Sequence, residues 1–447
     1  MSGTQLQFGG ARVVVAGMGK SGLAALELLA EKGARLRATD VKPLAELPGL
    51  AELGVPFALQ SPEVFQDADI IVISPGVACD LGPLEEARRR GVAVIGELEL
   101  ASYFLQGPVI GITGANGKTT TTALAGHILR QCGIPVQVGG NIGTPPASMV
   151  RASRADQWNV LELSSFQLET IQYFRARVGA CLNVTPDHLD RHHTFEIYAA
   201  AKRRLFETQQ AGDFAILNAD DATSASFAPC TPAQARWFSS SRRLERGAWL
   251  EDGRILLDGE RLMDAAQVPL RGLHNLENVM AAALASAIAG APPQGIAAAV
   301  QCFPGVEHRL ELVRSVSGVE FYNDSKATNV DATLKALAAF ERGLWVILGG
   351  KDKGSDYTPL IQPLRAKARA VLLIGAAAEK IAGHLGASVP LIRAGVIDAA
   401  VCQAYARAEP GDTVLLAPAC ASFDQFSSYE HRGRVFKDLV RALEPKE

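Results

Sequence analysis

The sequence predicts an α/β protein of three domains, each organised around a mainly parallel β-sheet. Two observations lead to this prediction. Short apolar runs alternate with helical stretches along most of the chain, which is typical of strand–helix–strand units. A chain of 447 residues is also long enough for about three domains. We place these domains at residues 1–97, 98–305 and 306–447.

Composition and charge exclude several classes of function. The net charge of -3 and the pI near 6.3 give no basic surface for nucleic acid. No apolar run approaches the roughly 18 residues of a membrane span, and the N-terminus lacks a signal-peptide pattern. The seven cysteines are scattered and contain no C-x-x-C pair, which favours reduced thiols. We therefore expect a cytoplasmic protein that binds neither nucleic acid nor membrane, and a monomer.

The first domain begins with a strand, a glycine turn and a helix. The strand covers residues 12–16, the turn 17–22, and the helix runs to about Lys32. A second strand at 35–39 ends in Asp40, about 20 residues after the turn. This spacing is typical of a Rossmann-like fold in which the acid binds a ribose. Taken alone, the pattern predicts NAD.

The central domain opens with a predicted phosphate loop at Gly111–Thr120, between a strand at 109–112 and a helix from about 119 to 131. Its glycines let main-chain amides approach a polyphosphate, its lysine supplies charge, and a hydroxyl can reach Mg²⁺. The spacing departs from the strict G-x-x-x-x-G-K-[ST] motif, because Ile112 stands where the first glycine belongs. The alternative is a glycine turn with an incidental surface lysine.

Two further residues of this domain are candidate Mg²⁺ ligands. Glu162 ends a strand at 158–163, and His188 follows a strand at 180–184. His188 could instead be an ordinary loop residue, and Asp187 could be a helix cap. By itself, Lys202 in a helix at 195–209 would be a solvated lysine.

The third domain carries three polar turns at one edge of its predicted sheet. They are residues 323–329, 349–353 and 418–426, and each follows an apolar strand. Lys326 and Lys353 could bind an anionic substrate, or they could be surface residues. Ser422 could be a helix N-cap. The residues alone thus predict an ATP-using enzyme with a second nucleotide-like site.

Eight short motifs stand in order along all three domains. They are T-G-A-N-G-K-T (113–119), N-I-G (141–143), E-L-S-S-F-Q-L-E (162–169), N-V-T-P-D-H-L-D (183–190), H-N (274–275), H-R (308–309), N-D-S-K-A-T-N (323–329) and P-A-C-A-S-F-D-Q-F (418–426). Together they resemble the Mur ligase family. The third and the last two resemble the branch of that family that adds D-glutamate.

The resemblance implies a division of labour and a reaction. The first domain would bind the UDP of a sugar nucleotide in place of NAD, the central domain ATP, and the third domain the amino acid. We therefore expect an ATP-dependent ligase that joins D-glutamate to UDP-N-acetylmuramoyl-L-alanine through an acyl phosphate. This reaction releases ADP and phosphate and belongs to cytoplasmic peptidoglycan precursor synthesis.

The resemblance also implies a set of site residues. Those expected at ATP are Gly114, Ala115, Asn116, Gly117, Lys118, Thr119, Thr120, Asn275, His308, Arg309 and Asp324. Those expected at the UDP-sugar are Gly19, Lys20, Ser21, Asp40, Ser74, Asn141, Gln167 and His188. Those expected at D-glutamate are Lys326, Thr328, Lys353, Ser422 and Tyr429, with Lys351 an alternative to Lys353. Mg²⁺ would be held by Thr119, Glu162, His188 and Lys202, the last as a carbamate, and the catalytic group would be Lys118, Glu162, His188 and Lys202.

Three other functions are alternatives to a D-glutamate ligase. A sibling amide ligase, such as a folylpolyglutamate synthase or a ligase for L-lysine or diaminopimelate, would differ at residues 323–329. An NAD-dependent oxidoreductase would leave the phosphate loop without a role. A non-catalytic nucleotide-binding regulator would not need Glu162, His188 and Lys202 together.

Overall fold

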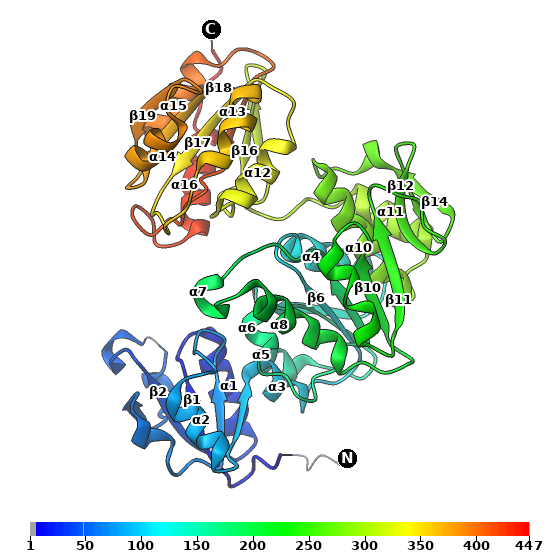
Figure 1. Cartoon of the computed structure of the whole chain (residues 1–447), viewed down its shortest axis with the longest axis vertical. Coiled ribbons are helices and arrows are strands. Elements are labelled where there is room, and N and C mark those ends of the chain that lie inside the picture. Colours follow the sequence, from blue (N-terminus) through cyan, green and yellow to red (C-terminus); the bar gives the residue numbers. More distant parts are fainter. Residues whose placement is uncertain (1–5, 48, 447) are drawn as a thin grey trace. The chain divides into compact units, whose positions relative to one another are not determined.

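The computed structural model describes residues 6–47 and 49–446, which form three sheets (Figure 1). The chain divides into two compact units. The first comprises Met1–Gln267 and Glu277–Phe303 and holds two sheets; the second comprises Val268–Leu276 and Pro304–Glu447 and holds the third. The α/β class with mostly parallel sheets is confirmed, whereas the three domain boundaries stay a prediction.

The first sheet is parallel and has the strand order β3-β2-β1-β4-β5. Helix α1 packs on one face through its Ala/Leu stripe, and α2 packs on the other. The order reverses beside β1, where a doubly wound sheet binds its ligand. The elements are β1 (Arg12–Ala16), α1 (Lys20–Glu31), β2 (Arg35–Asp40), β3 (Phe57–Leu59), β4 (Ile70–Ile73), α2 (Gly82–Arg89) and β5 (Ala93–Gly96).

The central sheet has nine strands in the order β14-β13-β12-β11-β10-β9-β6-β8-β7. The phosphate loop follows β6, which lies between β8 and β9, so the ends of these three strands meet. Its strands are β6 (Val109–Thr113), β7 (Val136–Gly140), β8 (Trp158–Glu162), β9 (Val178–Cys181), β10 (Phe214–Asn218), β11 (Gln234–Ser239), β12 (Gly247–Glu251), β13 (Arg254–Leu257) and β14 (Glu260–Asp264). Its helices are α3 (Glu97–Ser102), α4 (Lys118–Gln131), α5 (Pro146–Met149), α6 (Ser165–Leu168), α7 (Leu189–His192), α8 (Phe195–Glu207), α9 (Ala222–Ala225), α10 (Leu273–Ile288) and α11 (Pro293–Gln301).

The third sheet has the order β15-β16-β20-β17-β18-β19, parallel except for the hairpin β15–β16. Helices α12 to α14 cover one face, and α15 and α16 cover the other (Figure 1). The elements are β15 (Glu311–Val316), β16 (Val319–Asn323), α12 (Val330–Ala338), β17 (Leu344–Gly349), α13 (Ile361–Lys367), β18 (Ala368–Ile374), α14 (Ala378–Leu385), β19 (Leu391–Gly395), α15 (Ile397–Arg407), β20 (Thr413–Leu416) and α16 (Tyr429–Arg441). No helix among the described residues is long and apolar enough to cross a membrane.

Two predicted elements differ from the structure. The strand expected at 180–184 is β9, Val178–Cys181, because Asn183 turns away from the sheet to bind the phosphate loop. The helix expected from Asn278 begins at Leu273, directly after Gly272 in the left-handed region at φ 93°. The sequence also gave no prediction for edge strands such as β15 and β19.

Two buried glutamates of α3 bind main-chain amides elsewhere in the first unit. Glu99 accepts hydrogen bonds from the main-chain amides of Gln172, Tyr173 and Phe174. Glu97 accepts one from Ala147, at the start of α5, and its other oxygen is buried without a hydrogen bond in the described structure. Because burial disfavours the charged form, the pKa of Glu97 rises to about 8.

The raised pKa of Glu97 predicts a loss of stability with rising pH. The unfolded chain releases this proton near the ordinary value of 4.5, whereas the folded protein keeps it to about 8. The stabilisation is thus complete below pH 4.5 and lost as pH rises through 8. Glu97→Gln cannot ionise and keeps the acceptor for Ala147, so its melting temperature should exceed the wild type's by about 2 °C or more above pH 8. Melting temperatures are measured against pH for wild type, Glu97→Gln and the exposed control Glu52→Gln, which should follow wild type. The same dependence of melting temperature on pH in all three proteins would contradict the prediction.

Candidate active site

The phosphate loop depends on two glycines in conformations that other residues rarely adopt. Gly114 has φ 151° and Gly117 has φ 85°. A Cβ atom on Gly117 would also lie 2.2 Å from Asn278 Oδ1. The loop leads into α4, whose first-turn residues Thr119 and Thr120 are buried. The main-chain amides and the positive end of α4 therefore stand where a polyphosphate would be held.

Asn183 anchors this loop from the end of β9. Its side-chain oxygen accepts from the main-chain amide of Asn116 at 2.9 Å, and its main-chain oxygen accepts from Ala115 at 2.8 Å. Its amide nitrogen donates back to Asn116 O at 3.1 Å. The sequence analysis did not assign Asn183 a role. The available signal was a polar side chain at the end of a strand expected next to the loop.

Two lysine amines converge on one carbonyl oxygen. Lys118 Nζ and Lys202 Nζ each donate to Gly114 O at 2.8 Å, and Lys118 also donates to Ala115 O. Lys202 is only 1% exposed, so the alternative of a solvated lysine is wrong. Burial, and then the neighbouring Lys118 charge, lower the pKa of Lys202 to about 7. The neutral and the charged form of the Lys202 amine are therefore both populated near pH 7.

The candidate Mg²⁺ ligands follow the strands on either side of the loop. Glu162 ends β8 and is 2% exposed; one carboxylate oxygen accepts from Asn141 Nδ2 at 2.9 Å, and the other has no hydrogen-bond partner among the described residues. His188 has φ 52°, is half exposed, and packs edge-on against Phe166. The described residues contain no group of three His, Cys, Asp or Glu side chains that could by themselves hold a metal ion. An orphaned buried carboxylate oxygen beside a phosphate loop fits Mg²⁺, which takes few protein ligands.

A cavity of 620 Å³ opens at the end of the first sheet. The glycine turn at 17–21 and the loops 74–78 and 140–145 contribute to its wall. Seven of the residues expected at the UDP-sugar line it, namely Gly19, Lys20, Ser21, Asp40, Ser74, Asn141 and Gln167, whereas His188 does not. The sequence analysis missed other lining residues, among them Val41, Gln60, Gly143 and Pro145. Val41 and Pro145 are apolar and Gln60 lies outside every recognised motif, whereas Gly143 is part of the N-I-G motif at 141–143.

Asp40 braces the glycine turn. Its two carboxylate oxygens accept from the main-chain amides of Met18 at 2.6 Å and Lys42 at 2.9 Å. Ser74 supports the same turn, because its hydroxyl donates to Gly17 O at 2.6 Å. Both side chains thus shape the wall of the cavity through hydrogen bonds to main-chain atoms.

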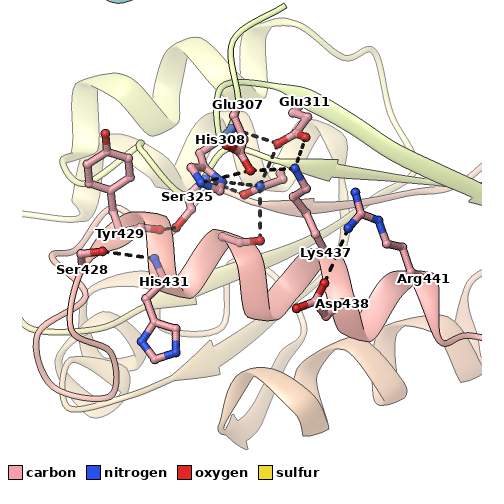
Figure 2. Close-up of polar contacts among 12 residues, drawn as sticks. Glu307, His308, Glu311, Ser325, Ser428, Tyr429, His431, Lys437, Asp438 and Arg441 are labelled. Atoms are coloured by element: carbon pink, nitrogen blue, oxygen red, sulfur yellow. Dashed lines mark hydrogen bonds and ion pairs between the residues drawn. The ribbon is translucent and has the colours of Figure 1, made fainter. Parts of the chain in front are cut away.

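The second unit holds the other expected nucleotide residues. Asn275 lies in the first turn of α10, and its amide donates to Arg271 O. Asp324 is buried after β16, and burial raises its pKa to about 6 against the opposing effect of Arg309. The Nε of Arg309 is buried and has no hydrogen-bond partner in the described part of the chain. His308 is 3% exposed, and Figure 2 shows it beside Glu307 and Glu311.

A buried arginine joins two of the three polar turns of this unit. Arg432, in α16, is fully buried and donates to both oxygens of Ser325 and to the main-chain oxygens of Cys420 and Ala421. It thereby ties loop 323–329 to loop 418–426. Sequence analysis missed Arg432, although it lies four residues before Phe436 on the apolar stripe of α16, where a charge must find partners.

The expected amino-acid residues line these same turns. Lys326 lies 5.5 Å from the centre of the Tyr429 ring, and Thr328 follows two residues later on the same loop. The hydroxyl of Ser422 is buried without a hydrogen bond in the described structure. The alternative that Ser422 caps a helix is wrong, because Ser428 caps α16. Lys351 and Lys353 are both exposed, so the choice of Lys353 stays a prediction.

Three family models match consecutive parts of the chain. They are the Mur ligase MurD-like N-terminal domain over residues 11–96, the Mur ligase middle domain over 112–286, and the Mur ligase glutamate ligase domain over 308–420. The chain belongs to the Mur ligase family and is an ATP-dependent amide ligase. The predicted enzyme class is confirmed, and the alternative of an NAD-dependent oxidoreductase is wrong.

Relatives of one name match nearly the whole chain. It is 64% identical over 438 residues to the UDP-N-acetylmuramoylalanine–D-glutamate ligase of Solibacter usitatus, covering 98% of this chain and 99% of the relative. It is 50% identical over 448 residues to the enzyme of the same name from Koribacter versatilis, a match that covers 98% of this chain and 99% of the relative. Among solved structures, MurF ligase from Thermotoga maritima in complex with ADP shares the fold. The TM-score is 0.62 at 17% identity, and the match covers 97% of this chain and 96% of the MurF chain.

Removing the Lys118 amine should abolish most ATP turnover. Lys118→Met keeps the length of the side chain but loses the charge that a transferring phosphoryl group requires. We expect kcat to fall by about 10² to 10³-fold, as for other donors that act on transition-state charge. The measurement is phosphate release from ATP under saturating substrates, with Lys32→Met, at a lysine outside the phosphate loop, as the control. A Lys118→Met enzyme with more than about a tenth of wild-type kcat would contradict this role.

Proposed function

We propose that this protein joins D-glutamate to UDP-N-acetylmuramoyl-L-alanine at the expense of ATP, as a monomer in the cytoplasm. The observation that carries the proposal is the whole-length match to D-glutamate ligases, at up to 64% identity. The product is a precursor of peptidoglycan. The phosphate loop, the 620 Å³ cavity and the polar turns of the second unit supply three binding regions for the three substrates.

The reaction has two chemical steps. The alanyl carboxylate attacks the γ-phosphorus of ATP, which forms an acyl phosphate and releases ADP. The amine of D-glutamate then attacks the acyl carbon, and the tetrahedral intermediate expels phosphate to leave an amide. The main-chain amides of Gly114–Thr120 and the Lys118 amine are placed to stabilise the phosphoryl oxygens, which carry the charge that develops in transfer.

Thr119, Glu162, His188 and Lys202 would hold Mg²⁺. When bound, this ion neutralises phosphate charge and orients the phosphoryl oxygens. The orphaned carboxylate oxygen of Glu162 supports this role. Asn141 contributes by fixing the other oxygen of Glu162, so that only one oxygen remains for the ion.

Lys202 would serve as a carbamate. The ammonium group first releases a proton; the neutral amine then attacks CO₂ and loses a second proton, which leaves a carbamate anion in place of the cation. The pKa near 7 supplies the neutral amine, and the anion would relieve the crowding of two ammonium groups at Gly114 O. Lys118 and a carbamylated Lys202 would attract each other instead of repelling.

The remaining residues are assigned to substrates by region. At ATP we place Asn275, His308, Arg309 and Asp324, together with the phosphate loop. At the UDP-sugar we place Gly19, Lys20, Ser21, Asp40, Ser74, Asn141 and Gln167, which line one cavity. At D-glutamate we place Lys326, Thr328, Lys353, Ser422 and Tyr429.

Amino-acid selectivity tests the proposed function. Phosphate release from ATP is measured with UDP-N-acetylmuramoyl-L-alanine and, separately, D-glutamate, L-glutamate, L-lysine, diaminopimelate or glycine. We expect turnover with D-glutamate alone. Turnover with another amino acid would make the protein a sibling ligase, and the absence of turnover with every amino acid would refute the proposal.

Lys202→Ala tests the carbamate. The variant should lose activity, and added CO₂ should not restore it, because the attacking amine is gone. The direct readout is ¹³C NMR of protein equilibrated with ¹³C-bicarbonate above pH 7.5, where the amine is mostly neutral. Wild type should show one carbamate carbon that Lys202→Ala lacks, with Lys32→Ala as control. Full activity of Lys202→Ala, or the same ¹³C signal in both proteins, would refute the role.

A further inference from the structure

The side-chain amide of Asn323 has a fixed orientation. Its oxygen accepts from the main-chain amide of Ser325 at 3.1 Å, a group that can only donate. Its nitrogen faces Glu311 Oε2 at 3.1 Å and Gly433 O at 3.4 Å, two oxygens that can only accept. Exchanging the oxygen and nitrogen would break all three contacts. The Asn323 nitrogen is therefore a donor on the side that faces His308.

This donor meets one nitrogen of the His308 ring. Asn323 Nδ2 lies 2.9 Å from His308 Nδ1. An N–H at Nδ1 would point at another N–H, so Nδ1 must accept and carry no proton. A neutral imidazole then has its proton on Nε2. Burial lowers the pKa of His308, which favours the neutral ring.

The His308 Nε2 atom is buried and has no hydrogen bond within the described residues. Glu307 Oε1 is 3.7 Å away, beyond hydrogen-bond distance. That carboxylate is also engaged by Lys437 at 2.9 Å, which binds Glu311 at 2.6 Å as well (Figure 2). A buried N–H donor without an acceptor is costly, and a bound ligand oxygen would satisfy it.

We propose that Asn323 is a positioning residue that fixes His308 as the Nε2–H tautomer, so that this ring donates a hydrogen bond to an oxygen of the bound nucleotide. The assignment of the ligand rests on the proposed function; the tautomer does not. Asn323 touches no substrate in this scheme and acts only through His308. Glu311 supports it by accepting from both the Asn323 amide and the His308 main-chain amide, the latter at 2.9 Å.

Close packing keeps the ring in this position. A Cβ atom on Gly433, in α16, would lie 2.2 Å from His308 Nδ1. The glycine therefore lets helix α16 approach the ring, and its carbonyl oxygen helps to orient the Asn323 amide. The main chain of His308 itself lies in the left-handed region, at φ 65°. These contacts leave the imidazole little freedom to turn over.

The tautomer is measured by ¹⁵N NMR of ligand-free protein labelled at its eight histidines. His308→Gln assigns the His308 signals, and His431→Gln, which removes an imidazole from α16, is the control. We expect a protonated Nε2 and an unprotonated Nδ1 at pH 7.5. In Asn323→Asp an oxygen replaces the donor, so Nδ1 should become protonated. A protonated Nδ1 in wild type, or no change in Asn323→Asp, would overturn the proposal.

The functional part is tested by a double-mutant cycle on ATP kinetics. Gln at position 308 carries an amide donor that has no tautomer. Asn323→Asp should lower kcat/KM for ATP by about tenfold or more in wild type, but by less than about twofold in the His308→Gln background. An equal loss of kcat/KM in the wild-type and His308→Gln backgrounds would mean that Asn323 acts independently of His308. That result would overturn the positioning role.

The two tests separate this inference from the proposed function. The NMR result needs no substrate, so it stands even if another amino acid proves to be the substrate. The kinetic cycle uses whichever amino acid supports phosphate release. If KM for the amino acid changed in Asn323→Asp while KM for ATP did not, the assignment of His308 to the nucleotide would be wrong.

Discussion

The carbonyl oxygen of Gly114 is the point on which the first unit's chemistry depends, because two lysine amines bind it at once. Burial of Lys202, and then the charge of the neighbouring Lys118, lower the pKa of Lys202. The loop holds this arrangement because Asn183 fixes it from β9 and Glu162 ends the strand on the other side. The positive charge gathered at this oxygen favours polyanionic ligands such as a polyphosphate.

Much of the fold and part of the site could be predicted from sequence. Local patterns were sufficient for the phosphate loop and for the strands beneath it, since these depend on glycine conformations and apolar runs of nearby residues. The same holds for the turn at Gly17–Gly22, whose spacing to Asp40 indicated a nucleotide fold. The spacing gave the wrong ligand, NAD. In the structure the Asp40 carboxylate accepts hydrogen bonds from main-chain amides. The resemblance supplied the ligand assignments.

Long-range contacts account for what the sequence did not predict. Asn183 meets Asn116 across 67 residues, a contact that no local pattern of either segment predicts. Burial of Lys202 and Arg432 was, however, available as a signal. Each is a charge on the apolar stripe of an amphipathic helix, with Tyr198 and Phe206 on one and Phe436 on the other. A charge in that position must have buried partners.

The arginine that joins two polar turns of the second unit has a consequence for synthesis on the ribosome. Ser325 is translated 107 residues before Arg432, the side chain that binds both of its oxygens. Until α16 emerges, loops 323–329 and 418–426 lack their common donor. Nascent chains that stop before this helix would carry the complete phosphate loop, whereas loops 323–329 and 418–426 would remain unjoined.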